Sequence, residues 1–162
     1  MKKKIFIVTG TRAEYGLLYN LIKKLDNYKL IDLKIIVTGM HLSKKYGNTY
    51  KEIINDGFKI HKKIDMKISS DTNFAISKSV GLGIINFAQL LKVEKPEMLI
   101  VLGDRYELFS SVIPANLQQI PILHIAGGDL TYGSQDDNIR HSISKMSWLH
   151  AVSNSNSRKR LF

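Results

Sequence analysis

The sequence contains no cysteine. A disulfide framework, a cysteine-based metal site and a cysteine nucleophile are therefore excluded for this chain. Because nothing in the sequence requires an oxidising compartment, a reducing cytoplasm is the simplest expected location.

Long apolar runs are also scarce. The basic start MKKKIFIVTG resembles the beginning of a signal peptide, but its apolar run is only about six residues long and lacks a small-residue cleavage site. A membrane-spanning helix needs about 20 apolar residues, and no segment approaches that length. We therefore expect the N-terminal run to be a buried first strand, and we expect no membrane partner.

Acidic residues are few relative to basic ones, 14 against 24, which gives a net charge of +10. This balance suits an anionic partner. The excess is mostly lysine, however, and it is scattered as pairs at 23–24, 44–45 and 62–63. No helix-turn-helix, zinc-finger or RNP-type signature is present. We therefore favour a solvated lysine-rich surface and expect no nucleic-acid partner.

Two common phosphate-binding motifs are missing as well. The turn GTRAEYG has only Gly10 and Gly16 where a dinucleotide-binding fold carries GxGxxG. The sequence therefore gives little support for an enzyme that transfers hydride with a dinucleotide cofactor. A Walker lysine is absent, which argues against ATP hydrolysis. Arg12 instead places a guanidinium at a predicted helix N-terminus, where it either contacts an anion or pairs with Glu14 on the surface.

What the sequence does contain is an alternation of buried strands and helices. Its 162 residues, 44% of them hydrophobic, suit one domain with a core. The pattern predicts an α/β fold, a Rossmann-like doubly wound parallel sheet. The expected strands are 5–9, 33–38, 58–64, 98–102, 121–125 and 149–152, and the expected helices are 13–25, 49–55, about 71–92, 105–117, 136–145 and one starting at Asn154.

Several helix details carry expectations of their own. Ser70 or Asp71 is the expected N-cap of the long helix. Gly81 and Gly83 each weaken that helix by about 1 kcal/mol relative to alanine, so we expect them to mark close helix packing. Pro114 can kink the helix that contains it. The sequence ends at 158–162 inside a helical pattern without a C-cap, as expected of a fragment.

The most informative stretch is 102–141, in which ionisable residues follow apolar runs directly. In an open α/β sheet, ligands bind beyond the carboxyl ends of the strands, so polar residues there point at a site. Asp104 and Arg105 follow one strand where a helix begins. Asp104 is therefore either an N-cap, a group that bonds a ligand or accepts its proton, or both. Glu107 lies in the first helical turn and is assigned chiefly to structure.

Two histidines also lie at predicted strand ends. His41 follows the second strand, and His124 lies within the end of a buried strand in HIAGGD. A lone histidine is more often structural than functional, but this position strengthens both candidates. Asp129 follows a glycine pair that either permits close approach of a ligand or serves only the turn.

The motif QDDNIRH adds two acid–base pairs on one predicted helix. The i, i+4 spacing brings Asp136 to Arg140 and Asp137 to His141, which by itself means a few tenths of a kcal/mol of helix support. Carboxylates that converge in one crevice also push each other's pKa values apart, which general acid–base chemistry uses. The sequence therefore predicts an acid–base site at this edge of the sheet.

The chain resembles the hydrolysing UDP-N-acetylglucosamine 2-epimerase family, especially its bacterial sialic-acid and legionaminic-acid branches. The resemblance rests on an ordered set of motifs over nearly the whole chain: GTRAEYGLL, TGMHLS..YGNTYKEI, LGDRYE, HIAGGD.T.GS.DD.IRH and IS.KMSWLH. It implies the N-terminal half of a GT-B fold, with residues 1–162 as one Rossmann-like domain and a C-terminal domain outside this chain. It also implies a cytoplasmic enzyme that is a homo-oligomer in its full-length form.

The resemblance implies a UDP-sugar substrate and a specific reaction. Members of the family cleave the bond between the anomeric carbon and UDP and invert C2, by anti elimination to a glycal and then addition of water. They need no metal or redox cofactor. Because the C2 proton is poorly acidic, the reaction needs a well-placed base and groups that stabilise the leaving nucleotide.

The resemblance also suggests roles for particular residues. Arg12 and Arg105 fall at nucleotide-contacting positions, and Asp104 falls at a catalytic carboxylate. Asp136 and Arg140 match the acid and the arginine of the later helix. The remaining substrate-binding candidates are His41, which matches a histidine of the sugar-side loop, His124 and His141.

One departure concerns Ala126, where many members carry glutamate in HIEGG. The HIAGGD form resembles the legionaminic-type branch, whose substrate is a UDP-linked 2,4-diacetamido-6-deoxy sugar. Asp129 or Asp137 is the expected compensating acid. Since the second domain supplies further nucleotide-binding groups in this family, the chain alone is expected to have negligible turnover.

Three other classes remain open at this point. A GT-B glycosyltransferase has the same architecture but uses an acceptor. A non-catalytic Rossmann-like binding module would tolerate Asp104→Asn and Asp136→Asn. Nucleic-acid binding through the +10 charge predicts a strongly salt-dependent duplex affinity.

Overall fold

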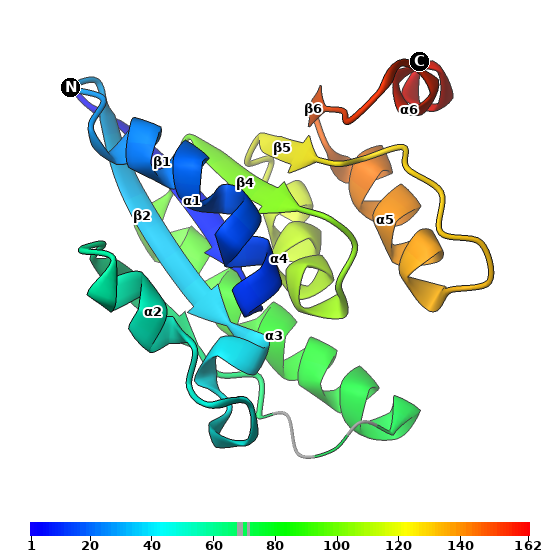
Figure 1. Ribbon diagram of the computed structural model, residues 1–162, viewed down its shortest axis with the longest axis horizontal. Coiled ribbons are helices and arrows are strands. Elements are labelled where there is room, and N and C mark those ends of the chain that lie inside the picture. The colour runs from blue at the N-terminus through cyan, green and yellow to red at the C-terminus, as the bar shows by residue number, and fades with distance from the viewer. Residues whose placement is uncertain (68–69, 71) are drawn as a thin grey trace.

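The computed structural model describes residues 1–67, 70 and 72–162 (Figure 1). Its centre is a six-stranded sheet in the order β3-β2-β1-β4-β5-β6, in which all neighbouring strands are parallel. The strands are β1 (Lys3–Thr9), β2 (Ile31–Thr38), β3 (Ile60–Ile64), β4 (Met98–Leu102), β5 (Ile122–Ile125) and β6 (Leu149–Ala151). The order reverses between β1 and β4, as in a doubly wound Rossmann-like sheet. The predicted fold class is therefore confirmed.

Helices cover both faces of this sheet (Figure 1). The helices are α1 (Arg12–Asp26), α2 (Tyr50–Asn55), α3 (Asn73–Glu94), α4 (Tyr106–Leu117), α5 (Gln135–Met146) and α6 (Ser155–Leu161), with short 3-10 turns η1 (Gly39–Leu42) and η2 (Lys44–Tyr46). Side chains of α1 and α2 form one core cluster with the sheet, and side chains of α3, α4 and α5 form the other. The sheet is thus the middle layer of three.

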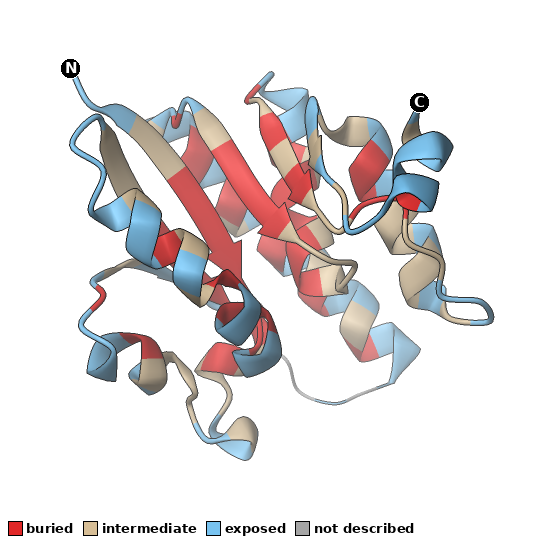
Figure 2. Ribbon diagram, turned by 45° about the horizontal axis from the view of Figure 1, so that its top comes forward, coloured by how far each residue is buried: buried red, intermediate tan, exposed pale blue. Residues whose placement is uncertain are grey.

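Alternation along β1 divides the two clusters. Phe6 and Val8 belong to the cluster on the α3–α4 side, whereas Ile7 belongs to the cluster on the α1 side. The last four residues of β1 and of β2 are all buried, as Figure 2 shows by the red ends of the central strands. Strands that are covered on both faces need such continuous apolar runs, which explains why they were recognisable in the sequence.

The N-cap residues of two helices can be compared with the predictions, because a cap is defined by the hydrogen bond that its side chain accepts. The N-cap of α3 is Thr72, whose hydroxyl accepts from the backbone N–H of Ala75. Ser70 is thus not the cap, and Asp71 lies outside the described residues. The last helix was predicted to start at Asn154; Asn154 is its N-cap, whose side chain accepts from the N–H of Ser157, and α6 begins one residue later.

Close packing of α3 on α4 occurs at Gly83. A Cβ at this position would lie 2.7 Å from Ser110 Oγ and 2.8 Å from Ser110 Cβ. At Gly81 a Cβ would meet no atom of the described residues within 4 Å. The packing prediction is therefore confirmed for Gly83 and wrong for Gly81. Helix α4 itself runs without interruption through Pro114.

By length and composition, α3 is apolar enough to cross a membrane, so the expectation that no segment reaches that length was wrong on this criterion. In the structure α3 packs against α4 and the sheet, and its residues Phe87 and Leu91 are fully buried in the core. Of the apolar window that meets this criterion, 28% is buried in the structure.

The two edge strands have different compositions. β3 carries the exposed residues Lys62 and Lys63. β6, at the other edge, contains only three residues, Leu149–Ala151. All six strands direct their carboxyl ends to the same edge of the sheet, at which the candidate site lies.

Candidate functional site

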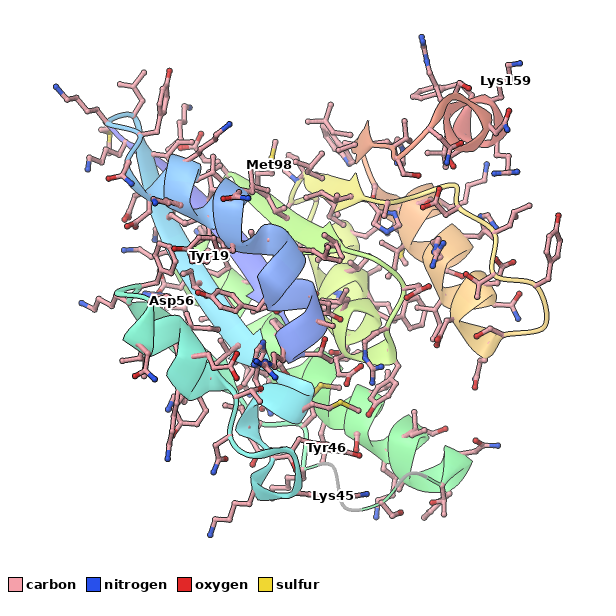
Figure 3. All side chains as sticks on the ribbon, viewed as in Figure 1. Tyr19, Lys45, Tyr46, Asp56, Met98 and Lys159 are labelled. Carbon is pink, nitrogen blue, oxygen red and sulfur yellow. The ribbon has the colours of Figure 1, made fainter. Side chains whose placement is uncertain are left out.

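The predicted site residues lie at or near the carboxyl edge of the sheet, and the structure joins some of them directly. In Figure 3, Met98 marks the amino end of β4, and Lys45 and Tyr46 lie at the opposite edge, beyond the end of β2. The segments at this edge are the β1–α1 turn, η1, the β4–α4 turn and the β5–α5 loop.

An ion pair joins two of these segments. Arg140 Nη2, from α5, donates to Asp104 Oδ2, from the β4–α4 turn. The two side chains are 13% and 18% exposed, so the pair is largely shielded from solvent. Of the alternatives for Asp104, the N-cap role is wrong, because Arg105 occupies the N-cap position of α4 and the Asp104 carboxylate bonds Arg140 instead.

The two neighbouring acids of α5 have different surroundings. Asp137 Oδ1 accepts from the N–H of Thr131 at 2.7 Å, and Asp137 Oδ2 lies 3.5 Å from His141 Nε2, which confirms the predicted i, i+4 pair. Among the described residues, none bonds the carboxylate of half-buried Asp136. The predicted pair of Asp136 with Arg140 is wrong, because Arg140 reaches across to Asp104.

His124 is fully buried, and both of its ring nitrogens have partners. Nε2 lies 2.7 Å from the carbonyl oxygen of Gly103, and Nδ1 lies 3.0 Å from Ser144 Oγ. Since a carbonyl can only accept, Nε2 carries the proton and donates. Burial lowers the pKa of His124 to about 4, so the ring is neutral at neutral pH. It holds the chain immediately before Asp104 against α5.

His41 is also fully buried. Its Nδ1 lies 2.8 Å from Thr49 Oγ1, and its Nε2 lies 3.1 Å from Thr9 Oγ1. Burial lowers the pKa of His41 to about 4. These contacts join η1 to β1 and to the start of α2, so His41 fixes the loop beyond β2.

Arg12 stands at the start of α1 with its side chain 74% exposed. Its Nε donates to Glu52 Oε2 of α2 at 3.0 Å. The alternative of a surface pair with Glu14 is wrong, because the Glu14 carboxylate is buried and accepts from the N–H of Gly10. The exposed guanidinium remains accessible to an anion.

Arg105 and Glu107 form a two-pronged ion pair at the start of α4. Arg105 Nε donates to Glu107 Oε2 and Arg105 Nη2 donates to Glu107 Oε1, both at 3.1 Å. The Glu107 side chain is fully buried, whereas that of Arg105 is 31% exposed. Glu107 thus has the structural role predicted for it, and it holds the guanidinium of Arg105 at the edge of the sheet.

Asp129 is engaged with the segment that follows β6. Its Oδ1 accepts from the hydroxyls of Ser153 and Ser157. Burial alone would raise the pKa of Asp129, but these hydrogen bonds hold it below its usual value. The preceding glycines serve this packing, because a Cβ at Gly128 would overlap the carbonyl of Ser157 and one at Gly127 would meet His124 Nδ1 at 2.8 Å.

A hollow of about 540 Å³ opens between α5 and α6. Arg140 and Asp129 line it together with Arg160, which is not among the residues predicted from the sequence. Arg160 Nη1 donates to the carbonyl of Gly128 at 2.9 Å. Its only sequence signal was its basic character near the end of the chain. Within the described residues, no group of three or more His, Asp or Glu side chains is arranged to hold a metal ion.

Ala126 follows β5 with φ +62°, in the left-handed region that side chains other than glycine rarely adopt. Its N–H donates to the carbonyl of Ala151 at 2.9 Å, which continues the β5–β6 pairing beyond β5. The position that departs from the family motif is therefore a turn residue with a special backbone conformation.

Solved structures define the fold class. A crystal structure of UDP-N-acetylglucosamine 2-epimerase superposes with a TM-score of 0.85 at 22% identity and covers 99% of this chain and 44% of the other. The UDP-GlcNAc 2-epimerase from Neisseria meningitidis, bound to UDP-GlcNAc, gives a TM-score of 0.83 at 24% identity, with 98% and 42% covered. The fold is thus the Rossmann-like N-terminal half of a GT-B fold.

Sequence comparison then identifies the family. The family described as UDP-N-acetylglucosamine 2-epimerase matches residues 23–162. The chain belongs to this family. It is 48% identical over 160 residues to the GDP/UDP-N,N'-diacetylbacillosamine 2-epimerase (hydrolyzing) of Campylobacter jejuni, covering 99% of this chain and 41% of the relative.

The Legionella pneumophila UDP-N,N'-diacetylbacillosamine 2-epimerase (hydrolyzing) is 40% identical over 161 residues, with 99% of this chain and 42% of the relative covered. The chain therefore spans about two fifths of the length of these curated relatives.

Proposed function

We propose that this chain provides the N-terminal half of the active site of a hydrolysing UDP-sugar 2-epimerase, which a C-terminal domain completes. The observation that carries the proposal is the Asp104–Arg140 pair at the carboxyl edge of the sheet. Arg140 shares α5 with Asp136, whose carboxylate has no hydrogen-bond partner among the described residues. A fixed carboxylate, a free carboxylate and a guanidinium are the groups that proton abstraction and anion stabilisation require. No metal or redox cofactor is needed for this chemistry.

In the proposed reaction, Asp136 and Asp104 exchange protons with the sugar, and Arg140 fixes Asp104. A base removes the C2 proton while the bond between C1 and the UDP oxygen breaks, which leaves a glycal and UDP. Water then adds to the double bond. Its oxygen bonds to C1, and C2 receives a proton on the face opposite to the one from which the first proton was removed, so C2 is inverted. Arg12, which follows β1, and Arg105, which follows β4, neutralise the charge of the departing diphosphate.

The histidines and the remaining acids have supporting roles in this proposal. His41 and His124 position the loops, since their ring nitrogens are already bonded within the protein. His141 and Asp137 bind the sugar side as a pair. Of the two acids considered as replacements at Ala126, we favour Asp137 over Asp129, because its partner His141 is itself a titratable group, whereas the bonded oxygen of Asp129 is held by the hydroxyls of Ser153 and Ser157.

We propose a UDP-linked 2,4-diacetamido-6-deoxy sugar as the preferred substrate, ahead of UDP-GlcNAc. Two relatives at 48% and 40% identity are named as diacetylbacillosamine 2-epimerases, and HIAGGD lacks the acid of the HIEGG form. The place of the reaction is nonulosonic acid biosynthesis of the sialic or legionaminic type. In this proposal the full-length enzyme is a cytoplasmic homo-oligomer.

The proposal is tested by proton NMR in D2O with each of the two UDP-sugars. The protein extended to the length of its relatives should release UDP and give a free 2-epimeric sugar that carries deuterium at C2. The 162-residue chain alone should show negligible turnover. Transfer of the intact sugar to an acceptor without inversion at C2 would identify a glycosyltransferase instead, and robust turnover by the 162-residue chain would contradict the need for a second domain.

A further inference from the structure

Glu14 is a buried acid beneath the turn that carries Arg12. Glu14 is 6% exposed, and its Oε2 accepts a hydrogen bond from the N–H of Gly10 at 2.7 Å. Its Oε1 is buried and has no hydrogen-bond partner among the described residues. Part of this arrangement is a capping box, since the Thr11 hydroxyl accepts from the Glu14 N–H. A capping box does not explain why one carboxyl oxygen is buried without a partner.

A second buried acid, Glu107, lies beside the same part of Gly10. The point that a Cβ of Gly10 would occupy is 3.1 Å from Glu107 Cβ and 3.6 Å from Glu14 Oε2. Glu107 already uses both carboxyl oxygens on Arg105. The other groups around Glu14 add no positive charge, because His41 in η1 is neutral and Arg12 turns outward to Glu52.

The cluster therefore contains two buried carboxyl groups and one nearby guanidinium. If both acids were ionised, one buried negative charge would have no cation, and such a charge is costly. A proton on Glu14 Oε1 removes this charge and leaves Oε2 free to accept from Gly10. Burial, and then the charge of Glu107, raise the pKa of Glu14 to about 7 despite its backbone hydrogen bonds.

We propose that Glu14 is a positioning residue for the nucleotide end of the site, which supports the Gly10–Arg12 turn as a neutral acid. In this form it adds no negative charge beside Arg105. When it ionises, the new charge offsets that of Arg105, and the site binds a nucleoside diphosphate more weakly. This inference rests on the proposed function, since it takes the diphosphate to lie near Arg12 and Arg105.

The protonation state can be measured without any ligand. The chain has only five glutamates, so selective carboxyl labelling gives a simple carbon NMR spectrum. One carboxyl should titrate near neutral pH, and the amide resonance of Gly10 should move with the same midpoint, because its N–H donates to Glu14. This readout uses the wild-type protein. Titration of all five carboxyls below about pH 5.5 would overturn the inference.

The effect on binding is measured by calorimetry with UDP as the probe. The dissociation constant is determined for the wild-type protein and for the Glu14→Gln variant. An amide keeps an oxygen for Gly10 and carries no charge. Between about pH 6 and 8.5, the wild-type dissociation constant should rise about tenfold more than that of the variant. Comparison with the variant removes the ionisation of UDP itself.

Glu97→Gln is the matched control, because Glu97 is exposed and pairs with Lys3 at the opposite edge of the sheet. This variant should retain the wild-type pH dependence. Equal pH dependence in the wild type and Glu14→Gln would contradict the inference. If the difference appears but no C2 inversion is detected, the inference stands and the proposed reaction fails.

Discussion

Arg140 is a half-buried guanidinium whose carboxylate partner, Asp104, lies 36 positions earlier in the chain. We expect Asp104→Asn to lower the free energy of unfolding by about 2–4 kcal/mol, because it leaves the shielded charge of Arg140 without a counter-ion. UDP release by the full-length enzyme should fall at least about 100-fold, since Asp104 belongs to the proposed acid–base machinery. Urea denaturation and a UDP-release assay measure the two effects.

Asp26→Asn is the control for this substitution. Asp26 is the exposed last residue of α1, so its replacement should change the free energy of unfolding by no more than about 0.5 kcal/mol and leave activity unchanged. If both variants behaved alike, the Asp104–Arg140 pair would have no energetic role.

At the residue scale, the sequence predicted that these groups lie near the strand ends, but it did not predict how all of them pair. Helical spacing assigned Arg140 to Asp136, whereas the long side chain of arginine reaches the next loop. Spacing succeeded for Asp137 and His141, whose pair is entirely within α5. Contacts within one helix follow from the sequence, but contacts between loops depend on a fold that the local pattern does not specify. Glu14 was missed for this reason, although the T-x-x-E capping box in TRAE was a visible signal.

At the scale of elements, two glycines of α3 offer a matched comparison. Gly83→Ala should lower the free energy of unfolding by about 1–3 kcal/mol, because the new methyl group overlaps Ser110 of α4. Gly81→Ala should raise it by about 0.5–1 kcal/mol, because the methyl group meets open space and alanine favours the helix. Denaturant unfolding of both variants checks the signs. Equal effects would mean that α3 and α4 do not pack at Gly83.

Elements with a strong apolar pattern were predicted most accurately. β4 was predicted at 98–102 and is found at Met98–Leu102, since a strand buried on both faces leaves little choice of residues. The start of α3 was less predictable, because Ser70, Asp71 and Thr72 are all good caps. Backbone geometry, which the sequence does not reveal, selects Thr72.

At the scale of the whole molecule, buried titratable groups should give a maximum of stability near pH 6.5. His41 and His124 have pKa values lowered from 6.5 to about 4, so their stabilising contribution is full above pH 6.5 and is lost as the pH falls through about 4. Glu14 has its pKa raised from 4.5 to about 7, so its contribution is full below pH 4.5 and is lost as the pH rises through about 7.

Urea unfolding across this pH range measures the effect, and Glu14→Gln isolates the alkaline part. Relative to the wild type, the variant should gain on the order of 3 kcal/mol between pH 4.5 and pH 7.5, about 1.4 kcal/mol for each unit by which the pKa is raised. Glu97→Gln should show no such gain. A constant difference between wild type and Glu14→Gln would mean that Glu14 ionises at its ordinary pKa in the folded protein.

The two edge strands of the sheet, β3 and β6, both disfavour the addition of a further strand. A strand from another molecule that approached β3 would have to strip water from Lys62 and Lys63 and hold their charges beside its own backbone. A strand that approached β6 would gain hydrogen bonds to only three residues. Charge at one margin and brevity at the other thus oppose further growth of the sheet by strand pairing between copies, so any association of copies has to use another surface than the sheet edges.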